Sequence, residues 1–208
     1  MRRKRVLLIA GMAALAATLA GAGHYMRSPY HTAGNGQGSA TGRSAVESLC
    51  QGYGESSVEA LADWSLIPED EDPVVWLVEN SVFCLDEDGI QRRLEEQMLN
   101  MELLAEASGC SCEEYLTETC GYDSAASYEQ EYREICVNFL KTRLAVYEVA
   151  QAEQITVSVQ EYRKKLQDYA GHYGYEEDAE RFENECERDS IAMEMLYDKT
   201  VEYLHGGA

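Results

Sequence analysis

The chain has 208 residues, of which 38 are acidic and 17 basic, and its formal net charge at pH 7 is −21. This excess of negative charge argues against a nucleic-acid-binding protein and against one that adheres to anionic lipid, because both partners would repel it. The length fits one main domain with short flanking segments.

The N-terminus has the composition of an export signal. Residues 2–5 are consecutive cations, residues 6–23 contain no charge, and the small residues 20–22 provide a cleavage site. The uncharged stretch is also long enough for a membrane span, which needs about 17–25 residues. Two outcomes stay open: a signal peptide over residues 1–23 that is removed near Ala22, or a signal-anchor helix that is kept. Either outcome predicts an extracytoplasmic domain, secreted or held in the cell membrane by a single span with the C-terminal domain outside.

Residues 24–43 predict a flexible linker, because glycine, serine, threonine and asparagine dominate there and large apolar residues are few. The folded part is then expected from about Ser44 to Leu204. Without the N-terminal cations, the exported part keeps 13 basic against 38 acidic residues, a net charge of −25. Such a charge favours solubility and repulsion between copies, while the oligomeric state stays open.

The chain has seven cysteines, an odd number that allows up to three disulfides in an exported protein and leaves at least one thiol. Cys136 and Cys186 fall on the apolar faces of expected helices, where cysteine packs as a small apolar side chain. We expect mostly free cysteines, with the number of disulfides left open.

The apolar spacing indicates an all-α fold. No proline follows Pro73, and the apolar residues beyond it recur with a helical period. Two short helices are expected over residues 44–53 and 56–66, followed by an acidic hinge at 68–73. Residues 74–78 are all apolar and fit either a helical turn or a buried strand.

A long helix is expected next, capped by Asp86 or Asp88 and stopped by Gly109. Ser111 and Glu114 have the spacing of a capping box, which predicts a short helix after the glycine. The apolar residues of the long helix lie three or four positions apart, as an amphipathic helix requires: Ile90, Leu94, Met98, Met101 and Leu104.

The longest helix is expected from a cap at Asp123 or Ser124 to the β-branched residues 155–157, which interrupt it. Ser158 and Glu161 have the spacing of a second capping box, which predicts that another helix starts there.

Glycines separate the helices that follow one another along the chain. Gly121 and Gly174 each end one helix before the next begins, and segments 176–184 and 187–204 are expected to close the domain as helices. Two such helix–glycine–helix hairpins predict two arms on an extended helical scaffold.

Short motifs in this helical region resemble the C-terminal domain of trigger factor in their order along the chain. Residues 78–83 (VENSVF) resemble the family element ENS-x-F, and residues 111–116 (SCEEYL) resemble its SLEDYL turn. Residues 141–150 (KTRLAVYEVA) resemble its K-x-x-LVLEAIA helix, and the similarity covers roughly residues 74–204. The resemblance places a chaperone domain at residues 74–208.

The resemblance implies an all-α, extended helical bundle with hairpin arms, the cradle that trigger factor shares with SurA-like chaperones. It implies an ATP-independent holdase that binds unfolded or partly folded exported polypeptides. The ribosome-docking loop of trigger factor, GFRxGxxP, is absent from the sequence, so ribosome binding is not implied. The FKBP-type isomerase domain is absent too, so the resemblance implies no prolyl isomerase activity.

Client-contacting residues are expected among the apolar and aromatic side chains of the arm and terminal helices. Methionine is unbranched and adaptable, and tyrosine combines an apolar ring with a polar tip. The alternative for each residue is that it fills an interface between helices, and the sequence leaves this choice open. The candidates are Met98, Met101, Phe139, Tyr147, Met193 and Met195.

The sequence contains no complete motif for a metal site or a catalytic site. Residues 86–89 (DEDG) have part of an EF-hand spacing, but the first ligand position would fall on Cys84, so a helix cap fits better. The cysteines at positions 110, 112 and 120 lack the paired Cys-x-x-Cys spacing of a zinc site. No histidine has the sequence context of a catalytic pair with a serine or cysteine. We therefore expect no metal, no cofactor and no enzyme activity. The competing function is a membrane-anchored helical adaptor or structural protein that binds one envelope partner.

Overall fold

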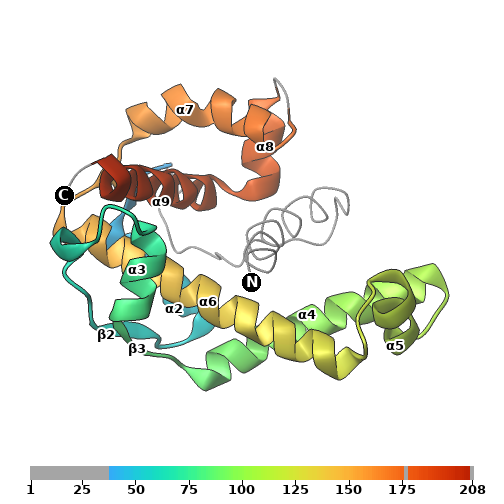
Figure 1. Cartoon of the computed structure of the whole chain (residues 1–208). Helices are drawn as coiled ribbons and strands as arrows, with labels where there is room; N and C mark the ends of the chain where they lie inside the picture. The colour runs from blue at the N-terminus through green and yellow to red at the C-terminus, as the bar shows by residue number, and fades with distance from the viewer. Residues whose placement is uncertain (1–37, 176–177, 207–208) are drawn as a thin grey trace.

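The computed structural model describes residues 38–175 and 178–206 of the chain. Helices account for most of these residues and form a central body from which two helical hairpins extend (Figure 1). The all-α, extended architecture predicted from the sequence is confirmed. The predicted N-terminal signal or anchor and most of the predicted linker lie outside the described residues.

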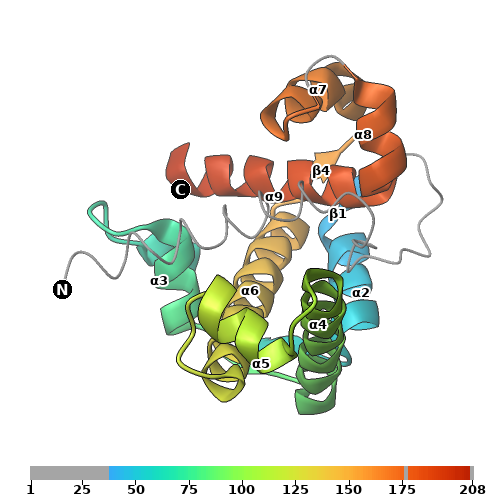
Figure 2. The same cartoon turned by 90° about the vertical axis from the view of Figure 1, so that its right-hand side faces the viewer.

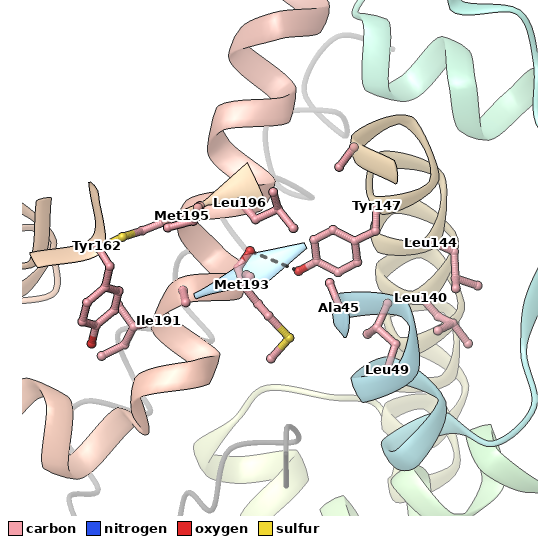
Figure 3. Close-up of a cluster of buried hydrophobic side chains, with 14 of the residues drawn as sticks. Ala45, Leu49, Leu140, Leu144, Tyr147, Tyr162, Ile191, Met193, Met195 and Leu196 are labelled. Carbon is pink, nitrogen blue, oxygen red and sulfur yellow. Dashed lines mark hydrogen bonds between the residues drawn. The ribbon is translucent and has the colours of Figure 1, made fainter. Parts of the chain in front are cut away.

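The body is built on the C-terminal half of α6 (Ala125–Ala152). This half packs against α2 (Gly42–Tyr53), α3 (Pro73–Asn80) and α9 (Arg188–Gly206), and Figure 2 shows how these helices surround it. One large apolar cluster fills the interior between them. Its fully buried members include Ala45, Leu140, Leu144, Tyr147 and Leu196 (Figure 3).

The first arm consists of α4 (Glu87–Ser108) and the N-terminal half of α6, with α5 (Cys112–Glu114) and the π-helical turn η2 (Tyr115–Thr119) between them. Figures 1 and 2 show α4 and α6 side by side, with α5 at the end of the arm that lies away from the body.

The predicted starts and stops of the first arm are confirmed. The Asp86 carboxylate accepts a hydrogen bond of 3.1 Å from the Gly89 amide and thereby caps α4. Gly109 ends this helix with φ 75° and ψ 24°, the left-handed conformation that favours glycine. Ser111 and Glu114 form the predicted capping box of the short helix that follows.

The second arm consists of α7 (Val159–His172) and α8 (Ala179–Cys186). Figures 1 and 2 both show α7 alongside α9, on the side of α9 that faces away from α6. The helices predicted to close the domain are confirmed as α8 and α9. The predicted capping box is only half formed, because Ser158 caps α7 but the Glu161 carboxylate binds Lys199 of α9 instead of the local backbone.

Two pairs of short antiparallel strands tie distant segments together. β1 (Ala40–Thr41) pairs with β4 (Thr156–Val157), and β2 (Ser57–Ala60) pairs with β3 (Val82–Cys84). The first pair joins the N-terminal segment to the connection between α6 and α7. Within the described residues, regular structure therefore begins at Ala40, inside the segment that was predicted to be linker.

The helix predicted over residues 56–66 is wrong. β2 occupies its first half, and a single 3₁₀ turn, η1 (Trp64–Leu66), lies at its end. Val58 lies opposite Phe83 in the strand pair, so a partner from a distant part of the sequence overrides the local helical spacing. The open choice at residues 74–78 resolves to helix, within α3.

Gly42 lets the start of α2 lie directly against the backbone of α6. A Cβ atom at this position would lie 2.5 Å from the backbone nitrogen of Gln151 and 2.5 Å from the carbonyl oxygen of Tyr147. Backbone atoms cannot rotate away as the end of a side chain can. The close approach of these two helices therefore requires glycine.

Replacing Gly42 with alanine tests this packing. Although alanine is the better helix former, we expect Gly42→Ala to lower the free energy of unfolding by about 1–3 kcal/mol, the usual cost of overpacking a core. The measurement is urea unfolding followed by circular dichroism. Gly206→Ala is the control, because a Cβ there meets nothing within 4 Å. Equal midpoints for the two variants would show that α2 can move away from α6 without cost.

Candidate client-binding surfaces

The first arm exposes an apolar strip on α4. Leu99 and Leu103 lie one helical turn apart and are 56% and 41% exposed. They stand on the opposite side of the helix from Leu94 and Ala105, which are buried. Both leucines face solvent and do not pack into the core, so this strip can bind an apolar segment of another polypeptide.

The strip lies in a segment of one charge sign. Residues 94–132 contain ten aspartate or glutamate residues and no lysine, arginine or histidine. Because residues 94–108 of α4 and the start of α6 both belong to this segment, repulsion between the arms of two molecules is strong at low ionic strength. The charge thus opposes self-association through an apolar strip that would otherwise promote it.

The predicted contact residues Met98 and Met101 also lie on α4, but they are only partly exposed. Helical geometry puts them on the same face as Leu94 and Ala105, toward the seam with α6. At this seam the Gln97 side-chain amide donates a 2.7 Å hydrogen bond to the Tyr128 hydroxyl. The two methionines therefore lie on the side of α4 opposite the strip and help to pack the arm.

Phe139 is partly buried on α6, where the first arm meets the body. Its ring centroid lies 6.0 Å from that of Tyr53 in α2. The guanidinium carbon of Arg143 lies 5.2 Å from the Phe139 ring centroid. Phe139 is thus one wall of the junction rather than a free-standing side chain.

Tyr147, Met193 and Met195 lie in the core of the body and are at most 3% exposed. The Tyr147 hydroxyl lies 3.4 Å from the Met193 carbonyl oxygen, to which it donates a hydrogen bond, and this bond links α6 to α9 (Figure 3). Figure 3 also shows Met195 near Tyr162 of the second arm. In this conformation a client polypeptide has no access to the three residues.

Arg143 holds the junction between α6 and α9. Its side chain is almost fully buried, donates a 2.9 Å hydrogen bond to Glu194, and lies 2.8 Å from the second carboxylate oxygen. The guanidinium also stacks 3.9 Å from the centroid of the Tyr197 ring. A buried cation is costly unless it is paired and hydrogen-bonded, and this one has both forms of compensation.

The sequence did not single out Leu99 and Leu103, because the search followed the continuous stripe from Ile90 to Leu104. A signal was present nonetheless. Both leucines fall between the stripe positions at a mutual spacing of four, and charged residues flank them on the same face. Apolar residues off the buried stripe of an amphipathic helix are candidates for exposure.

The ionisable groups of this region favour contact over chemistry. Burial raises the pKa of Tyr128 to about 12, so its hydroxyl stays neutral near pH 7. Burial also raises the pKa of the Cys112, Cys120 and Cys136 thiols, and a protonated thiol is a poor nucleophile. All seven cysteines are free thiols in the structure.

The described residues lack a metal cluster and a membrane-spanning helix. In residues 38–175 and 178–206, no cluster of three or more histidine, cysteine or acidic side chains is arranged to hold a metal ion. Among the same residues, no helix has the length and apolar character that a membrane span requires.

The fold and surfaces define an acidic, two-armed, all-α scaffold that displays apolar side chains on one arm. Residues 74–206 match the family model described as the bacterial trigger factor protein (TF) C-terminus. The chain therefore belongs to the trigger factor C-terminal family, whose domain is the chaperone part of trigger factor, and the predicted resemblance is confirmed. Comparison with curated proteins and with solved structures gave no match.

Substitutions on α4 separate its exposed strip from its packed face. We expect Leu99→Asp with Leu103→Asp to cost less than about 1 kcal/mol of unfolding free energy, because exposed positions lose little beyond helix propensity. We expect Met98→Asp with Met101→Asp to cost more than about 2 kcal/mol, because it places charges against the seam with α6. Urea unfolding followed by circular dichroism measures both. Equal losses of unfolding free energy in the two double variants would mean that α4 does not have one exposed face and one packed face.

Proposed function

We propose that this protein is an ATP-independent holdase that acts outside the cytoplasm and binds unfolded exported polypeptides. The observation that carries the proposal is the trigger factor C-terminal fold bearing an exposed apolar strip, Leu99 and Leu103, on an acidic arm. The charged start and uncharged stretch of residues 1–23 support the location.

The physical requirements of a holder match this arrangement. A client in an unfolded state exposes apolar side chains, and burial of apolar area drives association at about 25 cal/mol per Å² before the entropic costs of binding. The strip is small, so its contact with a client is weak and reversible. Release of the client therefore needs no covalent step and no bound nucleotide. The acidic surroundings keep unoccupied holders apart.

Suppression of aggregation tests the holdase. The purified chain at near-stoichiometric ratios should slow the aggregation of several unrelated denatured proteins, measured by light scattering. Leu99→Asp with Leu103→Asp should reduce the effect. The wild-type effect should persist at 1 M salt, where the Debye length falls from about 10 Å at 0.1 M to about 3 Å, because apolar contact is not screened.

Two outcomes would contradict the proposal. Protection of no denatured protein would favour the helical adaptor, which binds one folded partner. The second outcome is acceleration of a proline-limited refolding reaction. If the rate rises in proportion to the amount of protein and the effect survives repurification, the protein is an isomerase and not a holdase that lacks catalytic activity.

The extracytoplasmic location has its own test. In a bacterial host, we expect the chain with its own N-terminus to be digested by protease added to spheroplasts, because residues 1–23 direct its export. Cytosolic marker proteins serve as the control for lysis. A variant that lacks residues 2–23 should be protected. Protection of the complete chain would remove the extracytoplasmic part of the proposal and leave the holdase part intact.

A further inference from the structure

The second arm joins the body through two residues with unusual backbone conformations. Gln154, between α6 and β4, has φ 55°, and Glu187, between α8 and α9, has φ 58° and ψ 130°. Within the described residues, these are the only residues other than glycine with positive φ. A side-chain-bearing residue rarely adopts such angles, and Glu187 lies outside even the left-handed helical region. The entry and the exit of this arm therefore both hold strained backbone.

Side chains of α9 fasten the arm to the body. Lys199 donates hydrogen bonds to both carboxylate oxygens of Glu161, at 2.9 and 3.0 Å, and to the carbonyl oxygen of Thr156, at 2.8 Å. The Tyr169 hydroxyl donates a 2.5 Å hydrogen bond to Asp198. Water can reach these groups and compete for their hydrogen bonds, so each contact is worth little by itself and can break without unfolding the body.

The arm covers an apolar face. Tyr162 of α7 and Phe182 of α8 are buried together with Ile191 and Met195 of α9, each at most 3% exposed. Figure 3 shows Tyr162, Ile191 and Met195 on one side of α9, away from the side that meets Tyr147. This part of the apolar cluster lies across α9 from the contacts with α6, so α6 can keep those contacts if the arm moves.

We propose that the α7–α8 hairpin is a hinged cover, held on α9 by Lys199 and Asp198, and that the face beneath it is a second client-binding surface. Gln154 and Glu187 are the pivots. The occupant is an extended apolar segment of an unfolded polypeptide, which suits the isoleucine and adaptable methionine of α9 and the aromatic rings on the inner side of the hairpin. The nature of the occupant rests on the proposed function, whereas the hinge does not.

Hydrogen exchange measured by mass spectrometry tests the hinge. In Lys199→Met with Tyr169→Phe, we expect exchange of α7 and α8 amides to quicken roughly five- to tenfold, which corresponds to about 1–1.4 kcal/mol in total for the two water-accessible contacts removed. Exchange in α2 and the C-terminal half of α6 should be unchanged.

The matched control for the hinge is Lys164→Met with Tyr173→Phe. It makes the same two chemical changes at exposed side chains of the second arm that do not hydrogen-bond to α9. Equal exchange in the two double variants would overturn the hinge. Exchange that rises evenly in all helices of the Lys199→Met variant would overturn it as well, because that result describes general destabilisation.

Binding of reduced, carboxymethylated lactalbumin, which stays unfolded, tests the covered face. If the open state binds this probe, its apparent Kd should fall by the same factor by which opening rises. The probe should also protect the amides of residues 191–196 from exchange. Faster opening with unchanged affinity and no such protection would overturn the second surface but keep the holdase. Failure of the wild-type chain and of every variant to bind the probe would instead overturn the proposed function.

Discussion

The contact of α6 with α9 around Arg143 holds the whole structure together. The guanidinium is buried, pairs with Glu194 and stacks on Tyr197, while Tyr147 bonds across the same interface. Removing one partner of such a pair leaves a buried charge without compensation, which costs about 3–5 kcal/mol. Both arms leave from this junction, since α6 extends into the first arm and α9 lies beneath the second. The junction therefore sets the points from which the two arms extend.

The family match begins at residue 74, yet the domain is not complete without the residues before it. β1 pairs with β4 at the base of the second arm, and α2 packs against α6 so closely that Gly42 is required. β2 supplies the partner of β3 at the base of the first arm. The segment that the sequence presented as linker, short helices and hinge therefore braces the bases of both arms.

Local signals predicted much of the first arm, and distant contacts explain the errors. The caps at Asp86, Ser111 and Ser124 depend on neighbouring residues, so their spacing could be read directly from the sequence. The strand at residues 57–60 depends on a partner more than twenty residues away, which no local pattern encodes. The same holds for Glu161, whose spacing predicts a bond to Ser158 but whose carboxylate meets Lys199, 38 positions along the chain.

The candidate site was harder to predict, because a helical stripe marks burial more directly than it marks function. Met193, Met195 and Tyr147 lie on stripes, and the structure buries them. Leu99 and Leu103 lie off the stripe, and the structure exposes them. Composition pointed to methionine and tyrosine, whose side chains suit contact with varied partners. It could not tell whether a given methionine or tyrosine packs between helices of this chain or contacts a client.

The proposed holder has to satisfy two opposed requirements. Apolar area that captures a client also promotes aggregation of the holdase, and a large exposed patch would be a liability. The structure separates the two requirements. A small strip remains exposed on an arm that contains no cation between residues 94 and 132, while a second apolar face lies covered beneath α7 and α8. In the proposed mechanism, opening of the second arm costs its polar contacts with α9 and also the exposure of the apolar face that it covers. The population of open molecules therefore limits the affinity of this face for clients, and release needs no energy source because closure of the arm competes with the client for the same face.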